Sequence, residues 1–254
     1  MKKGIRGLVT SVIRVSPHLI RISFRLSQGL RYFPGRSVWM YRAEQNDAGS
    51  LEPCFQLCGC PELAYRTNHY EVLAETAFYR DSVRGLGRVK MGDLIQVKGP
   101  FGQFWPLAAR PETNVVWIAT PQLLGPYLAC VQSRNFEKVR PRKIVLLIEV
   151  KTEQEIPERK LFESKGVTVI PCITQPQNWV DGFWGRLIDL IKSDRFKLPF
   201  HDARFFVSTD PQLSGELWNC LVYEKGVNPA QITEESVSSS QEVSGKFLGF
   251  FKAA

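Results

Sequence analysis

The sequence is poor in the residues from which several kinds of site are built. It has three histidines, His18, His69 and His201, and they stand far apart without a nearby acid and nucleophile to complete a hydrolytic triad. No apolar run approaches the roughly 18 residues that a membrane span needs. The first residues, Met-Lys-Lys-Gly-Ile-Arg, are not an apolar signal core. We therefore expect a cytoplasmic protein without a membrane span.

Cysteine is also sparse, with six residues in a chain of 254. A chain of this length without a secretion signal does not depend on disulfides, so reduced thiols are expected. The spacing C-x3-C-x-C at positions 54, 58 and 60 lacks the C-x2-C pair that is usual in zinc sites. A strand would spread these thiols too widely for one ion, so we predict packing thiols and no metal site.

Acidic residues are outnumbered by basic ones, which gives a formal net charge of +8 and a pI near 9.2. This balance favours an acidic partner, whether nucleic acid, an anionic cofactor or an acidic protein. The one dense basic run, 138-KVRPRK-143, contains a proline and precedes a strand, so we interpret it as a solvated loop. The basic residues are otherwise dispersed and no nucleic-acid-binding motif is present, which argues against nucleic acid.

Residues 1–108 are typical of a small antiparallel β-barrel or sandwich. Short segments such as LIRISFRL and DLIQVKG alternate apolar and polar residues, which is the period of two of half-buried strands. Turn signals, among them PGR at 34–36 and MGD at 91–93, separate these segments. We predict a first domain of the small β-barrel or sandwich type over this range.

Residues 114–235 follow a different pattern, in which strand and helix alternate. Apolar runs such as VVWIAT and KIVLLIEV indicate strands buried on both faces, hence a parallel sheet between helices. In such sheets ligands bind beyond the carboxyl ends of the strands, near Thr120, Lys151, Thr174 and Thr209. The remaining residues, 236–254, are serine-rich and then aromatic, and form either a flexible tail or a final docked element.

The stretch 117-WIATPQLLGPYLACVQ-132 lacks the glycines expected of a phosphate-binding turn. It predicts a buried strand that leads directly into a helix. Backbone N–H groups at such a turn approach a phosphate where side chains are absent. Here Pro121 removes one N–H donor and Gln122 adds bulk.

The order of these parts resembles the ferredoxin-NADP reductase superfamily, and most closely its bacterial flavodoxin/ferredoxin reductases. Their nucleotide domain opens with an A-T-G-T-x-x-G-P-[YF]-L segment, and the residues in matching places are Ala119, Thr120, Gly125, Pro126, Tyr127 and Leu128. Three further segments are similar to segments of this family: GLRYFPGRSVWM at 29–40, Gly-Arg at 185–186 and STDPQL at 208–213. The resemblance spans about Gly4 to Glu235 and implies FAD, NADPH and an acidic ferredoxin or flavodoxin-like partner.

The resemblance also implies which residues would hold the flavin. The family's R-x-Y-S segment corresponds to Pro53-Cys54-Phe55-Gln56, so that Phe55 would stack on the flavin ring and Gln56 would lie near its reactive nitrogen. Pro53 offers no charge for the pyrophosphate. The segment where the family has its second phosphate-binding turn could compensate through Arg80, Ser82 and Arg84.

In the nucleotide domain the resemblance points to a second group of residues. Ser208 replaces the cysteine that the family has beside the nicotinamide, which makes it the candidate catalytic residue, and Thr209 replaces a glycine. Thr120, Gly125 and Pro126 belong to the cofactor turn. Lys151 and Arg186 would hold the extra phosphate of NADPH, or are ordinary surface cations.

Two hypotheses follow from this pattern. The first is a divergent reductase that transfers electrons between NADPH and a small acidic carrier through FAD. The second is a catalytically inactive protein on the same scaffold, which would act in a protein complex as a subunit or adaptor through its surface. Changes at Pro53, Pro121 and Gln122 favour the second hypothesis, whereas the retained order of motifs favours the first.

Overall fold

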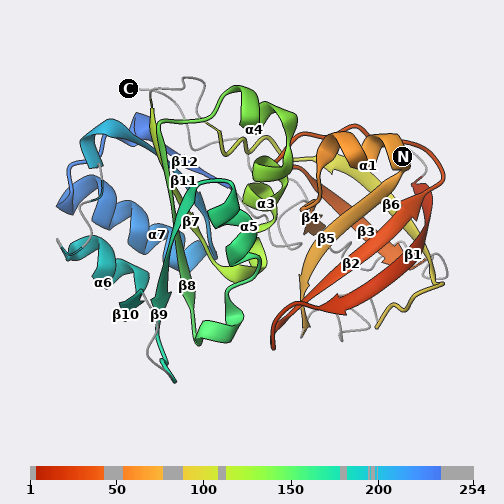
Figure 1. Cartoon of the computed structure of the whole chain (residues 1–254), viewed down its shortest axis with the longest axis horizontal. Coiled ribbons are helices and arrows are strands. Elements are labelled where there is room, and N and C mark those ends of the chain that lie inside the picture. Colours follow the sequence, from red (N-terminus) through yellow and green to blue (C-terminus); the bar gives the residue numbers. More distant parts are fainter. Residues whose placement is uncertain are drawn as a thin grey trace, which may run out of the picture.

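The structure, a computed structural model, describes residues 4–42, 54–76, 88–107, 113–177, 182–193, 195, 198 and 200–235. These residues form two β-sheets that lie side by side (Figure 1). The first is antiparallel and the second is parallel with helices on both faces. This arrangement confirms the predicted fold class, a β-barrel followed by an α/β nucleotide-binding-type domain.

Six strands form the antiparallel sheet in the order β4-β3-β6-β1-β2-β5. Their bounds are β1 (Ile5–Arg14), β2 (Leu19–Leu26), β3 (Ser37–Arg42), β4 (Cys54–Gln56), β5 (His69–Glu75) and β6 (Leu94–Phe101). A bridge between Leu57 and Val72 joins the two edge strands and closes the sheet into a barrel. The alternation predicted from the sequence is present, because Val38 and Met40 are fully buried inside the barrel and Trp39 between them is partly exposed.

The parallel sheet also has six strands, in the order β10-β9-β8-β7-β11-β12. Their bounds are β7 (Asn114–Ala119), β8 (Lys143–Val150), β9 (Val167–Ile173), β10 (Phe183–Trp184), β11 (Ala203–Ser208) and β12 (Ile232–Glu234). The central strand β7 is almost wholly buried, which explains its continuous apolar sequence. The carboxyl ends of these strands lie at one edge of the sheet, and the predicted site residues follow them.

Helices cover the two faces of the parallel sheet (Figure 1). On one face lie α6 (Leu187–Lys192) and α7 (Pro211–Asn219), and on the face toward the barrel lie α3 (Gly125–Gln132), α4 (Arg134–Lys138) and α5 (Arg159–Ser164). A further helix, α1 (Pro61–Thr67), lies on the barrel. Short helical turns are η1 (Pro121–Leu123), η2 (Glu153–Glu155), η3 (Phe200–Asp202), η4 (Cys220–Glu224) and η5 (Pro229–Gln231). Within the described ranges, no helix has the length and apolar character that crossing a membrane requires.

The two domains share their hydrophobic interior. Ala129 of α3 packs among the buried residues of the barrel, whereas Cys58 and Leu73 of the barrel belong to the core around Trp117. The Nε2 of Gln132 on α3 donates a hydrogen bond to the carbonyl oxygen of Cys58 at 3.0 Å. Helix α3 therefore joins the barrel to the parallel sheet and fixes the junction where the site residues lie.

Candidate functional site

Three polar side chains from the two domains meet at the junction. Gln56 ends β4 of the barrel, Ser208 ends β11, and Glu235 directly follows β12. The Nε2 of Gln56 lies 2.5 Å from Oε2 of Glu235 and 3.4 Å from Oγ of Ser208, and the Ser208 hydroxyl donates to the same Glu235 oxygen. We call these three residues the junction cluster. Ser208, the predicted catalytic residue, is thus in contact with Gln56, which the resemblance predicted to lie near the flavin.

The carboxyl group of Glu235 has an unusual protonation equilibrium. Burial between the two domains raises the pKa of Glu235 to about 7, although the hydrogen bonds from Ser208 and Gln56 partly oppose the shift. The carboxyl group therefore exchanges a proton near neutral pH. A carboxyl group of this kind can take up or release a proton at physiological pH.

Two buried polar atoms at the junction have no hydrogen-bond partner among the described residues. These are Oε1 of Gln56 and Oγ1 of Thr120, the residue that follows β7. A buried carbonyl or hydroxyl oxygen without a partner costs on the order of 1–3 kcal/mol, and a water or a ligand that supplies the missing bond removes that cost. The amide oxygen of Gln56 can accept a hydrogen bond from a ring N–H, and the Thr120 hydroxyl can donate or accept.

The altered turn after β7 packs against the barrel. Thr120 is followed by η1, and α3 begins at Gly125 with Pro126 buried in its first turn. A side chain at Gly125 would bring its Cβ to 2.8 Å from the Cβ of Gln56, so glycine is required here by the close approach of β4. The sequence predicts Gly125 as a cofactor residue, and the structure gives it a packing role as well.

The two predicted phosphate-binding cations lie near one edge of the parallel sheet. Lys151 follows β8 and is exposed, and its carbonyl oxygen accepts a hydrogen bond from the backbone N–H of Gln175 after β9 at 2.8 Å. Arg186 precedes α6, and its Nη2 lies 2.8 Å from Oε2 of Glu216. This hydrogen bond raises the pKa of Arg186. Lys151 therefore offers its charge to solvent, whereas Arg186 already has an anionic partner.

The aromatic residue predicted to stack on a flavin ring faces the barrel interior. Phe55 is 4% exposed and packs in the barrel core, on the inward face that it shares with Val38, its partner across the β3–β4 pair. The residues on the outward face of β4 are Cys54 and Gln56. Phe55 therefore packs in the barrel core, on the opposite face of β4 from Gln56. Pro53, Arg80, Ser82 and Arg84 lie outside the described residues.

Glu235 is the site residue that the sequence analysis did not single out. It stands at the boundary where the second domain was expected to end and the serine-rich tail to begin. Thr209, which was singled out, is 3% exposed, and its hydroxyl donates to the carbonyl oxygen of Asp210 at 3.3 Å. An acid directly after a strand at the carboxyl edge of a parallel sheet was the available signal for Glu235.

Comparisons with known proteins agree with this architecture. No family model and no curated protein matches the sequence. Solved structures do match: a ferredoxin NADP+ reductase from Neisseria gonorrhoeae with bound FAD and NADP has a TM-score of 0.72 at 16% identity, over 92% of this chain and 99% of that one. The FAD/NAD-binding domain of nitric oxide dioxygenase from Vibrio cholerae has a TM-score of 0.73 at 17% identity, over 92% and 98%.

A cytochrome P450 reductase from Amycolatopsis is similar at a TM-score of 0.74 and 14% identity, over 92% of this chain and 69% of that one. Together these structures show that the chain has the two-domain fold that the resemblance predicted.

Proposed function

We propose that the protein is a flavin-dependent oxidoreductase, which transfers electrons between NADPH and a small acidic carrier of the ferredoxin or flavodoxin kind through FAD. The observation that carries this proposal is the junction cluster. Gln56 lies far from Ser208 and Glu235 in the sequence, and the three form a hydrogen-bonded group between two apolar cores. Packing alone does not require a carboxyl group that titrates near pH 7 in this place.

The residues of the junction fit the ring of a flavin. Oε1 of Gln56 and Oγ1 of Thr120 are buried without partners, and both can bond to ring or amide groups of a ligand. The chemistry that bound FAD supplies is acceptance of a hydride from NADPH and release of two single electrons, with one proton left over for each NADPH. Glu235 is the residue that can take up this proton, because its carboxylate and acid forms are both populated near pH 7.

The net charge of +8 supports an acidic carrier, because opposite charge speeds the encounter of two redox proteins. Lys151, which is exposed beyond β8, supports NADPH as the electron donor. The second candidate function, an inactive subunit or adaptor on the reductase scaffold, is favoured by Pro121 and Gln122 in the turn and by the pairing of Arg186 with Glu216.

The visible absorption spectrum distinguishes these functions. The purified protein is measured as isolated and again after incubation with FAD and desalting. We expect a flavin spectrum with about one FAD per chain, bleaching of that spectrum by NADPH, and a loss of turnover of about 100-fold in Glu235→Gln. A colourless protein that retains no FAD would overturn the reductase function and direct attention to protein partners.

A further inference from the structure

Three apolar side chains are exposed close together on the outside of the barrel. Leu8 on β1 lies directly opposite Leu94 on β6 in the antiparallel register, and Met91 belongs to the turn that precedes β6. Their exposed fractions are 43%, 62% and 77%. The turn is held against β1, because the N–H of Gly92 donates to the carbonyl oxygen of Val9 at 2.9 Å. We call Leu8, Met91 and Leu94 the apolar patch.

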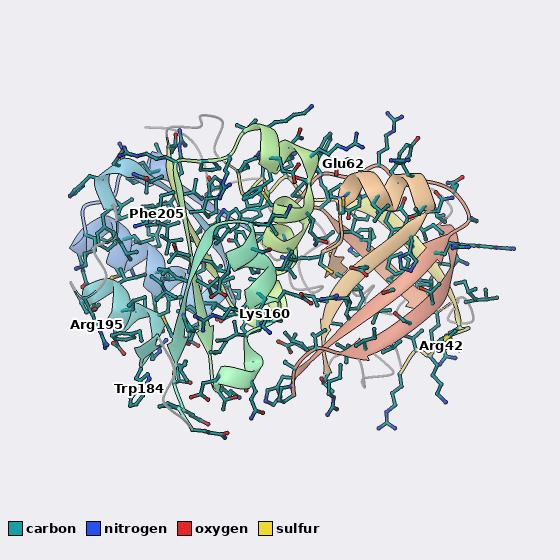
Figure 2. The ribbon with its side chains drawn as sticks, viewed as in Figure 1. Arg42, Glu62, Lys160, Trp184, Arg195 and Phe205 are labelled. Atoms are coloured by element: carbon teal, nitrogen blue, oxygen red, sulfur yellow. The ribbon has the colours of Figure 1, made fainter. Side chains whose placement is uncertain are left out.

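The apolar patch lies at the end of the barrel that is remote from the junction cluster. Asp93, two residues after Met91, forms an ion pair with Arg42 at 3.6 Å. Figure 2 shows Arg42 at the end of the barrel farthest from the α/β domain. Arg42 is the last residue of β3, whereas Gln56 of the junction cluster pairs with Ser37, the first residue of that strand. The patch therefore does not belong to the site already described.

Basic side chains surround the apolar patch. Arg25 on β2 lies opposite Leu8 in the strand register, and Arg6 precedes Leu8 by two residues on the same face of β1. Lys90 begins the turn, because its carbonyl oxygen accepts a hydrogen bond from the N–H of Asp93 at 3.0 Å. These three basic residues are exposed, and none of them has an ion-pair partner within the described part of the chain. The rim of the patch is therefore positively charged.

We propose that the apolar patch attaches the protein reversibly to the surface of a membrane that contains anionic lipid. Exposed apolar side chains can enter the boundary between lipid headgroups and acyl chains, and a basic rim is attracted to the anionic headgroups. A stable interface with a second copy or another protein takes about 20–30 residues a side, so three apolar residues are too few to form one. A lipid surface requires no matching partner residues, and it is negatively charged where the rim is positive.

Sedimentation with vesicles tests this attachment on the full chain. Vesicles of phosphatidylcholine alone are compared with vesicles in which about one third of the lipid is phosphatidylserine. We expect the protein to bind the phosphatidylserine vesicles at least tenfold more strongly, because only these attract the basic rim. Raising the salt concentration should weaken this binding, since salt screens the attraction. Absence of binding to both kinds of vesicle would overturn the proposal.

A pair of serine variants separates the apolar patch from the net charge of the protein. Met91→Ser removes the most exposed apolar side chain of the patch, and we expect it to bind phosphatidylserine vesicles about tenfold more weakly. The matched control is Tyr223→Ser, because Tyr223 is 76% exposed on η4 of the α/β domain. Neither substitution removes core packing. If both variants bind like the original protein, the net charge of +8 alone accounts for the binding and the proposal is wrong.

A second pair of variants tests the basic rim. Arg6→Gln combined with Arg25→Gln should weaken binding to phosphatidylserine vesicles about tenfold. The control is Lys138→Gln combined with Lys143→Gln, which removes the same charge from the basic run at 138–143. The control is expected to lose much less affinity. A larger loss in the control would assign vesicle binding to the basic run and contradict the proposal.

Two further measurements ask whether a protein covers the apolar patch instead. If the chain sediments in analytical ultracentrifugation as a dimer that Met91→Ser dissociates, the patch joins two copies of the chain. If an acidic flavodoxin binds Met91→Ser more weakly than Tyr223→Ser while vesicles bind both variants equally, the patch is a surface for a protein partner. Either result would overturn membrane attachment, whereas vesicle binding that depends on both Met91 and the two arginines would establish it.

Discussion

The junction cluster and the turn η1 lie at the same edge of the parallel sheet but differ in what they offer a ligand. The cluster has a titratable acid, a hydroxyl and an amide with one unpaired oxygen. The turn begins with Pro121 and continues with Gln122, which together offer fewer N–H donors and more bulk than a glycine turn. This edge of the sheet therefore carries side chains suited to proton exchange, in the junction cluster, but its turn η1 is poorly suited to binding a phosphate. Three experiments test this contrast.

The largest expected effect concerns Glu235 and the stability of the fold. Its pKa is raised to about 7 in the folded protein from an ordinary value of 4.5, so the folded state binds a proton that the unfolded state releases between these pH values. The free energy of unfolding should therefore fall as the pH rises through this window, by at most about 3 kcal/mol from this group. Glu235→Gln keeps a neutral side chain and should lose less stability between pH 5 and pH 8.

Urea unfolding of both proteins at pH 5, 6, 7 and 8 measures this difference. The control is Glu234→Gln, which changes the exposed neighbouring acid on β12. If the free energy of unfolding depends on pH in the same way in the original protein and in Glu235→Gln, Glu235 is an ordinary solvated acid. The contrast between the junction cluster and η1 would then be lost.

The second experiment asks whether Gly125 serves packing. Gly125→Ala would place a methyl group 2.8 Å from the Cβ of Gln56, so we expect a loss of about 1–3 kcal/mol in the free energy of unfolding. Gly215→Ala on α7 is the matched control, because a Cβ there meets nothing within 4 Å and alanine should add roughly 0.5–1 kcal/mol. Thermal and urea unfolding give both values. Equal stability of the two variants would contradict the close approach of β4 to α3.

The smallest expected effect is at the turn. Pro121→Gly combined with Gln122→Thr restores a donor and removes bulk, so NADPH should bind about tenfold more tightly. Titration calorimetry measures the affinity for NADPH. The control is Pro229→Gly at the start of η5, which precedes β12 and lies away from the turn. Absence of binding in both the original protein and the variant would mean that the turn is not a nucleotide site.

Sequence patterns predicted the architecture more fully than the site. Alternation in the first half and continuous apolar runs in the second predicted the two sheets, since both patterns reflect burial over many residues. Helices α1 and α4, of seven and five residues, were missed because they are too short to show a helical period. Motif order predicted Gln56 and Ser208 as site residues, and the structure brings their side chains together. Motif order could not show that Phe55 faces inward, because the face on which its side chain lies is set by the strand register that pairs it with the buried Val38.

Glu235 illustrates a further limit of sequence patterns. Its contacts with Gln56 and Ser208 join positions 179 and 27 residues away in the chain. Only the three-dimensional pairing of β12 with β11 brings them together. The one local signal, that Glu235 directly follows Ile232–Glu234, does not show which residues its side chain contacts.

The shared interior described for helix α3 has a consequence for how the protein moves. Because Ala129 is buried in the barrel and Cys58 and Leu73 are buried against the parallel sheet, a hinge rotation of one domain would expose apolar surface on both. The ion pair between Arg21 and Glu158 would break in the same rotation. We therefore expect the two domains to behave as one rigid body, so that ligands are admitted by rearranged side chains and not by opening of the whole molecule.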